Sequence, residues 1–192
     1  MHEQYTIRRK VFAFLGQSFH IYDEGGAVVG FCRQKALRLK EDLRIYTSPA
    51  KDQELLLIKA RNVIDWWATY DIKTPDGILL GSVRRKGMSS SLIRDHWLIF
   101  DVNENEIGSV LEDSAGLGFA RRFLPFVSLL SPQSYTIQKN GEKSAIATLR
   151  THANIFIRRL GIAIHGESEE IPELFVLAIG CLLAAMEART EG

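Results

Sequence analysis

The C-terminal part of the chain carries a helix-forming segment with almost no polar face. Pro172 and Glu173 suit the first turn and the N-terminal dipole of a helix, and 13 uncharged, mostly apolar residues then run from Leu174 to Met186. A helix that is apolar all round lies in a protein core or in a bilayer. At 1.5 Å per residue this segment is roughly 20 Å long, whereas the hydrocarbon layer is about 30 Å thick. We therefore expect the segment to be buried in protein.

Small residues make parts of this helix thin, so that surrounding backbone can approach it closely. A glycine inside a helix costs about 1 kcal/mol relative to alanine, so Gly180 predicts a packing requirement at its position. The alternative is a contact between membrane helices of the small-xxx-small type, formed by Gly180 and Ala184. The sequence leaves this alternative open.

The preceding chain repeats one hairpin pattern, in which an aromatic-rich strand ends in Asp, a turn follows and the next strand contains Gly. The three copies are FHIYDEGGAVVGF from Phe19, ATYDIKTPDGILLGSV from Ala68 and WLIFDVNENEIGSV from Trp97. Their Asp and Gly residues are Asp23 and Gly30, Asp71 and Gly81, and Asp101 and Gly108. Turn-forming residues such as Pro75-Asp76-Gly77 favour a reversal between the apolar runs. A weaker copy runs from Tyr135 to Leu149.

Further strands are expected at Asp42 to Tyr46, Glu54 to Ala60 and Ile155 to Ile164, which brings the total to about ten or more. No low-complexity tract or hinge divides the chain, so we expect one domain over residues 1–192. A helix that is apolar on every side must be covered by protein on every side, and strands are the remaining elements of the chain that can cover it. A mainly β fold, with a closed antiparallel barrel around the C-terminal helix, buries the helix and removes the sheet edges.

Charge and cysteine content narrow the function classes. The 24 Lys and Arg residues against 23 Asp and Glu give a formal net charge of +1, so no global field draws the chain to nucleic acid or to an anionic membrane, and any anion binding must be local. Cys32 and Cys181 have no metal-type spacing, and two cysteines make no disulfide framework, which fits a reducing compartment. The N-terminus lacks the apolar core of a secretory signal, so we expect a cytoplasmic protein with no transmembrane span.

Two segments and the late apolar helix carry a family resemblance. RRKGMSSSLIRDHWLIFD from Arg84 to Asp101, together with QKALRLKEDLRIY from Gln34 to Tyr46, resembles the LURP-one-related family, which is grouped with the tubby C-terminal domains and the phospholipid scramblases. The resemblance covers about Tyr5 to Arg189 and is nearest to the small bacterial type. It implies a barrel of twelve strands threaded by a central C-terminal helix.

The resemblance implies less about activity, because fold does not fix function. Tubby domains bind phosphoinositides, scramblases are linked to lipid movement, and most LURP-one-related proteins are uncharacterised. The chain has neither the proline-rich N-terminal extension nor the cysteine cluster of scramblases, and the lipid-contact positions of tubby domains cannot be matched residue by residue. No site residue is therefore transferred from the family.

Basic clusters are the most suggestive candidates for a site. They are Arg8-Arg9-Lys10, Arg84-Arg85-Lys86, Arg121-Arg122 and Arg158-Arg159. Alternate residues of a strand face opposite ways, so Arg84 and Lys86 share one face and Arg85 takes the other. If the hairpins bring two such halves together, Arg84, Lys86, Arg8 and Lys10 would grip a phosphorylated head group. The alternative is a solvated outer face paired with Glu41, Asp42, Glu112 and Asp113.

Signals for other chemistry are weak. Ser89 to Ser91 beside Asp95 and His96 lack the second glycine of a nucleophile elbow, so we expect no catalytic residue and no cofactor. The five histidines are scattered, and we expect no metal site. Glu167, Glu169 and Glu170 resemble a helix lead-in more than a calcium loop. Trp66, Trp67 and Trp97 suit a core or a strand pair better than base stacking.

The favoured function is a non-enzymatic module that binds an anionic lipid head group, such as a phosphoinositide, or another phosphorylated small ligand. Such a module would lie in the cytoplasm or peripherally at the inner membrane surface. One alternative is a scaffold for protein partners with no small ligand. A second alternative is a scramblase-like protein associated with a membrane. An enzyme would require convergent polar residues in one pocket, and the sequence shows no such set.

Overall fold

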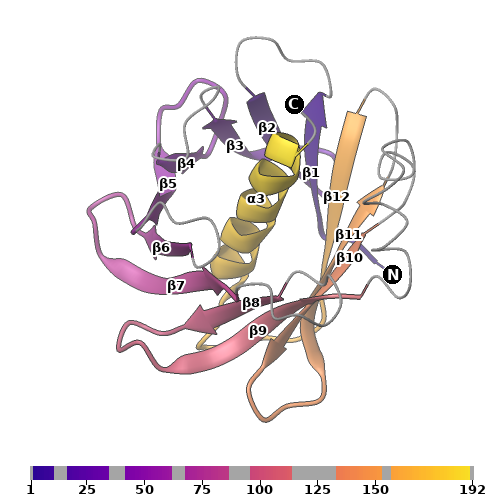
Figure 1. The fold of residues 1–192 in the computed structure, drawn as a ribbon. Helices are drawn as coiled ribbons and strands as arrows, with labels where there is room; N and C mark the ends of the chain where they lie inside the picture. The colour runs from indigo at the N-terminus through magenta and orange to yellow at the C-terminus, as the bar shows by residue number, and fades with distance from the viewer. Residues whose placement is uncertain are drawn as a thin grey trace.

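Antiparallel strands close into one barrel in the computed structural model (Figure 1). The structure describes residues 2–10, 17–34, 42–61, 68–86, 96–113, 133–152 and 157–190. The strands are β1 (Tyr5–Lys10), β2 (Gln17–Asp23), β3 (Val28–Gln34), β4 (Leu43–Tyr46), β5 (Glu54–Ala60), β6 (Thr69–Lys73), β7 (Leu79–Arg85), β8 (His96–Phe100), β9 (Glu106–Glu112), β10 (Ser134–Lys139), β11 (Ala145–His152) and β12 (Ile157–Ile164). Helix α3 (Glu173–Thr190) follows them.

The barrel has the simplest possible topology. Each strand pairs with its neighbours in the sequence, and β1 pairs with β12 to close the ring. Closure leaves no sheet edge exposed. The prediction of a mainly β fold, closed around a single C-terminal helix, is therefore confirmed, as is the count of twelve strands that the family resemblance implied.

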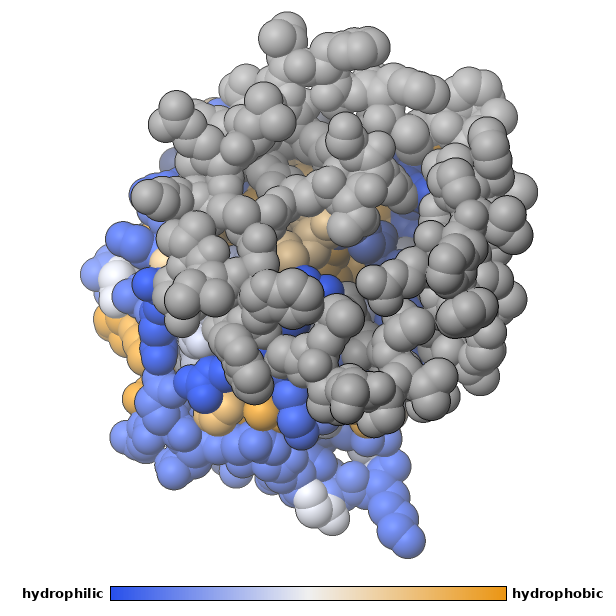
Figure 2. Space-filling model, in the orientation of Figure 1, coloured by the Kyte–Doolittle hydropathy of each residue, from blue (hydrophilic) through white to orange (hydrophobic). Residues whose placement is uncertain are grey.

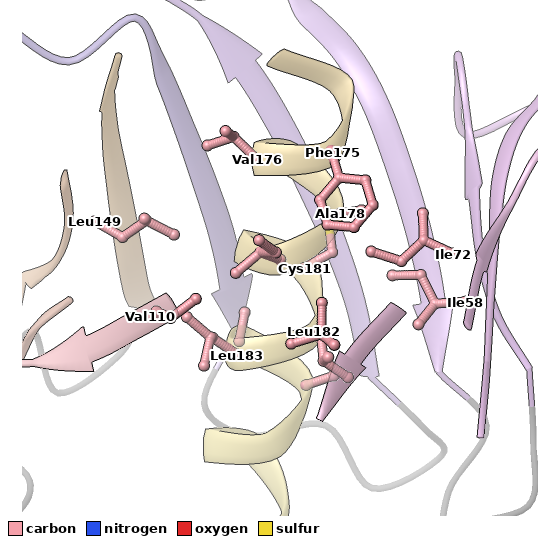
Figure 3. Packing of buried hydrophobic residues seen from close by; sticks show 14 of the residues in the cluster. Ile58, Ile72, Val110, Leu149, Phe175, Val176, Ala178, Cys181, Leu182 and Leu183 are labelled. Carbon is pink, nitrogen blue, oxygen red and sulfur yellow. The ribbon is translucent and has the colours of Figure 1, made fainter. Parts of the chain in front are cut away.

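Helix α3 runs through the barrel, and its central turns are buried on all sides (Figures 1 and 3). Figure 3 shows Phe175 and Leu182 on the side that faces Ile58 of β5 and Ile72 of β6. Figure 2 shows hydrophilic residues over most of the described surface that is visible, with a few apolar residues between them. Apolar residues thus gather around α3, as predicted for this segment. None of the helical residues described here forms a segment long and apolar enough to cross a membrane.

Gly180 has the packing requirement that the sequence predicts. A Cβ atom at this position would lie 2.8 Å from Cδ1 of Ile162 and 3.1 Å from Cδ1 of Ile7. Both isoleucines point inward from β12 and β1, which are the two strands that close the ring. The missing side chain therefore lets the helix approach the seam of the barrel.

The hairpin repeat has a common geometry at its turns. In each copy an inward isoleucine pairs with the strand glycine: Ile21 with Gly30, Ile72 with Gly81 and Ile99 with Gly108. A β-bulge follows each isoleucine, which bends the strand and increases its twist. A Cβ atom at Gly81 or Gly108 would lie 2.5 Å from the carbonyl oxygen of Phe100 or Gln138. Gly81 and Gly108 therefore allow neighbouring backbone to come close at the curved end of their hairpins, and Gly30 makes room for the side chain of Ile21.

The alignment of Asp71 with Asp23 and Asp101 was wrong. Asp23 and Asp101 each stand seven residues before their glycine, and each accepts a hydrogen bond from a turn amide through Oδ1. The residue at this spacing in the middle copy is Thr74, whose Oγ1 accepts a hydrogen bond from the amide of Ile78. Asp71 lies within β6 and forms ion pairs with Arg61 and Lys73.

Strand β1 is an element that the sequence analysis did not assign. Its sequence YTIRRK has few apolar residues, because only alternate positions face the interior. Ile7 and Arg9 face inward and are buried, and Tyr5 on the same face packs against the core. The predicted last strand is confirmed as β12, which begins at Ile157; Ile155 and Phe156 lie outside the described residues.

Both cysteines are expected to resist thiol reagents in the native protein. Burial raises the pKa of Cys181 to about 12 and raises the pKa of Cys32 well above its ordinary value. Because the thiolate is the reactive form, labelling with Ellman's reagent at about pH 8 should be negligible until the barrel unfolds. Guanidinium should then release both thiols. Rapid labelling without denaturant would contradict this placement.

Candidate anion-binding face

The four residues predicted to bind a ligand fall into two separate pairs. Arg84 lies on β7 and Lys86 directly follows that strand, whereas Arg8 and Lys10 belong to β1. In the ring, β1 and β7 are six strands apart in either direction. The two pairs therefore lie on opposite sides of the barrel and cannot form one site. The structure describes the backbone of Lys10 but not its side chain.

The charge of Arg84 is already compensated. Its Nη2 lies 3.3 Å from Oε2 of Glu104, and its Nε donates a hydrogen bond of 3.1 Å to Oγ1 of Thr69. The guanidinium also lies 4.4 Å from the ring centroid of Phe100. These contacts match the alternative of a solvated outer face with paired charges. Lys86 is exposed, and its backbone amide bonds to the carbonyl of His96.

Arg8 occupies a different environment. It faces outward from β1, between its register partners Arg159 on β12 and His20 on β2. The guanidinium lies 4.1 Å from the ring centroid of Tyr22, and this cation–π contact fixes its position. Within the described part of the chain, no carboxylate forms an ion pair with Arg8 or Arg159.

Outward side chains of four neighbouring strands extend this basic surface, which we call the β1 face. Its members are His20 of β2, Arg8 of β1, Arg159 of β12, and Arg150 and His152 of β11. Neighbouring strands lie about 4.8 Å apart, so the cross-strand row of His20, Arg8, Arg159 and His152 is continuous. Glu3 is the acid that contacts this face, at 2.7 Å from Nε2 of His152.

The other halves of the basic doublets point into the barrel, as strand alternation predicts. Arg9 and Arg158 are register partners and are only 4% and 8% exposed. Arg85 lies 5.7 Å from the ring centroid of Trp97, which is a core residue as predicted. Glu112 was expected on the solvated outer face; this was wrong, because it is buried. Glu41, Trp66, Trp67, Arg121 and Arg122 lie outside the described residues.

A surface cleft of about 370 Å³ lies between the β10–β11 turn and the connection from β12 to α3. The three acids that were weighed as ion ligands, Glu167, Glu169 and Glu170, line it. Lys139 Nζ lies 3.2 Å from Oε2 of Glu170, and this bond raises the pKa of Lys139. The described residues contain no group of three side chains placed to hold a metal ion. Within the cleft, Lys139 thus pairs with Glu170 and Glu142.

The serine-rich segment weighed for catalysis cannot be placed, because Ser89 to Ser91 and Asp95 lie outside the described residues. His96 begins β8 and is half-buried. Burial and the neighbouring Lys86 hold the pKa of His96 below its usual range. The imidazole is therefore neutral over a wider pH range than a free histidine.

Comparison with known proteins gives one result. The model of the LURP-one-related family matches residues 3–181, which includes all the strands and the first half of α3. Searches of curated proteins and of solved structures returned no match.

Proposed function

The chain belongs to the LURP-one-related family, and we propose that it is a non-enzymatic module that binds anionic head groups at the β1 face. The ligand class is a phosphorylated lipid head group or a related phosphorylated small molecule. One observation carries the proposal: Arg8 and Arg159 stand side by side on paired strands with no carboxylate partner among the described residues.

The chemistry of arginine supports this choice of ligand. A guanidinium presents a planar fork of donors that matches two phosphate oxygens. Two such forks on adjacent strands suit one phosphate group. Tyr22 holds the guanidinium of Arg8 in place, which reduces the ordering that a ligand must impose. Arg84 is also held over an aromatic ring, but a phosphate would have to displace Glu104 from it.

The proposed location is the cytoplasm, with peripheral contact at the inner membrane surface. Two buried free thiols fit a reducing compartment. A basic face on a rigid barrel suits the anionic cytoplasmic leaflet, where each Arg or Lys near the surface contributes about 1 kcal/mol.

The double variant Arg8→Ala/Arg159→Ala is expected to lose most binding to anionic vesicles. Two surface cations at about 1 kcal/mol each correspond to a roughly 30-fold weaker partition. Co-sedimentation with phosphatidylcholine vesicles that contain a minority of phosphatidylglycerol or phosphatidylinositol 4-phosphate measures this. Wild-type binding should weaken as salt is added.

Two control variants test whether vesicle binding depends on the β1 face in particular or only on the number of basic residues. Lys59→Ala/Lys143→Ala removes two exposed lysines outside the β1 face and should bind within about twofold of wild type. Arg84→Ala/Lys86→Ala tests the opposite side of the barrel and should have a similarly small effect. Equal loss in all three variants, or a wild type that binds no anionic vesicle, would overturn the proposal and favour a scaffold for protein partners.

A further inference from the structure

The side chain of Glu3 lies across the β1 face rather than out in solvent. Its carboxylate carbon and both oxygens are the atoms nearest to the position that a Cβ of Gly161 would occupy, and a Cβ there would collide with them. The carboxylate also bonds to Nε2 of His152. The bare backbone of Gly161 therefore forms the floor of an anion position on β12.

Basic residues flank this floor on β11 and along β12, whereas its register partner on β1 is Thr6. Arg150 is the register partner of Gly161 on β11, and Arg159 is two residues away on the same face of β12. His152 is in turn the register partner of Arg159. A glycine in a strand interior marks a place where another group approaches closely. Here the approaching group is an anion that the chain itself supplies.

We propose that the floor over Gly161, beside the pair of Arg8 and Arg159, is a phosphate position of the β1 face, and that Glu3 occupies it as an internal competitor. This inference rests on the proposed function, because the competitor matters only if an external anion binds there. A phosphate group would replace the carboxylate over Gly161, accept the bond from His152 and gain contacts with Arg150 and Arg159. The unliganded protein is then held in a weaker-binding form by its own N-terminal segment.

The contacts of Glu3 suit exchange rather than permanent structure. Its side chain is 24% exposed and that of His152 is 47% exposed, and ion pairs at such surface positions contribute little to stability. A doubly charged phosphate is a stronger acceptor than a carboxylate for the same donors. Exchange at this position is therefore favourable without any change in the barrel.

The neighbouring residues allow the Glu3 side chain to leave while the backbone stays in place. The amide group of Gln4 accepts a hydrogen bond of 2.8 Å from the backbone nitrogen of Ile164 and donates one of 3.2 Å to its carbonyl oxygen. The hydroxyl of Tyr5 bonds to Glu173, and this bond raises the pKa of Tyr5 to about 12. Release therefore requires only rotation of one side chain.

The variant Glu3→Gln should bind anionic vesicles at least about fivefold more tightly than wild type, because a competitor lowers apparent affinity by the fraction of time that the site is open. Glu24→Gln is the matched control. It removes one charge from an acid that pairs with His2, at 3.1 Å, away from Gly161. It should bind like wild type. Vesicles of phosphatidylcholine with phosphatidylinositol 4-phosphate, which carries a phosphomonoester, are the lipid probe, and inorganic phosphate as a competitor is the soluble probe.

The outcomes separate this inference from the proposed function. Tighter binding by Glu3→Gln, without tighter binding by Glu24→Gln, supports the inference. If inorganic phosphate competes with this binding, the ligand is a free phosphate. If inorganic phosphate does not compete, the ligand is a lipid head group. If Glu3→Gln binds like wild type, or no better than Glu24→Gln, while Arg8→Ala/Arg159→Ala loses binding, the inference is overturned and the proposed function stands. If wild type and Glu3→Gln both fail to bind either probe, both are overturned.

Discussion

Replacing Gly81 with alanine is expected to destabilise the barrel by about 3 kcal/mol, by combining backbone strain with overpacking. Gly81 has a φ of +153°, which side-chain-bearing residues rarely adopt. Its Cβ would also lie 2.5 Å from the carbonyl oxygen of Phe100 and 2.9 Å from Cε2 of Phe175. The carbonyl belongs to the paired strand β8 and cannot move without breaking the sheet. Equilibrium unfolding in urea measures the loss.

Two further glycines serve as controls that separate backbone strain from the collision of an added Cβ atom. Gly77 has a φ of +89° with open space around its Cβ position, and Gly166 has open space and no positive φ. Gly77→Ala should therefore cost about 1 kcal/mol, and Gly166→Ala should change stability by less than about 0.5 kcal/mol. If Gly81→Ala unfolds at the same urea concentration as Gly166→Ala, the close approach of β7, β8 and α3 is wrong.

Truncating Phe175 to alanine is expected to cost about 3 to 5 kcal/mol, the range for a buried aromatic residue whose cavity cannot collapse. Phe175 lies in the first turns of α3, is 1% exposed and packs over Gly81. The barrel wall around it is a hydrogen-bonded ring, which resists collapse. The change in unfolding free energy should be accompanied by a lower melting temperature.

The adjacent residue on the same helix provides the control. Leu174 is 36% exposed, so Leu174→Ala should cost less than about 1 kcal/mol. Because Phe175 and Gly81 touch, the double variant Gly81→Ala/Phe175→Ala should be less destabilised than the sum of the two single variants. Equal effects of Leu174→Ala and Phe175→Ala would place α3 in a different rotation, or outside the barrel.

The architecture could be predicted because its main determinants are local. The apolar segment from Leu174 to Met186 has a length and composition that exclude solvent exposure, and the turns with Gly25-Gly26 and Gly77 mark their hairpins. Strand β1 was missed because its inward residues, Tyr5, Ile7 and Arg9, end in a buried arginine and so form no clear apolar alternation. That Arg9 faces the interior is evident only in the structure, where it pairs with Arg158 of β12.

The site was only partly predictable for a similar reason. Strand alternation correctly divides Arg84 from Arg85 and Arg8 from Arg9. It does not say where two strands stand in a closed ring, so Arg84 and Arg8 were grouped although β7 and β1 are opposite. Whether an arginine is neutralised also depends on distant acids. Glu104 pairs with Arg84, whereas Arg8 and Arg159 meet only when the first and last strands pair.

That pairing also sets the order of events during synthesis. Strand β1 leaves the ribosome with one hydrogen-bonding edge that stays unpaired until β12 has been made, since β12 is its second partner. Helix α3, which fills the interior of the barrel, is translated after β12. Until then the nascent sheet is open and lacks α3, and it exposes its edge strands and its apolar inner face. Shielding by chaperones is therefore most valuable while β12 and α3 have not yet joined the sheet.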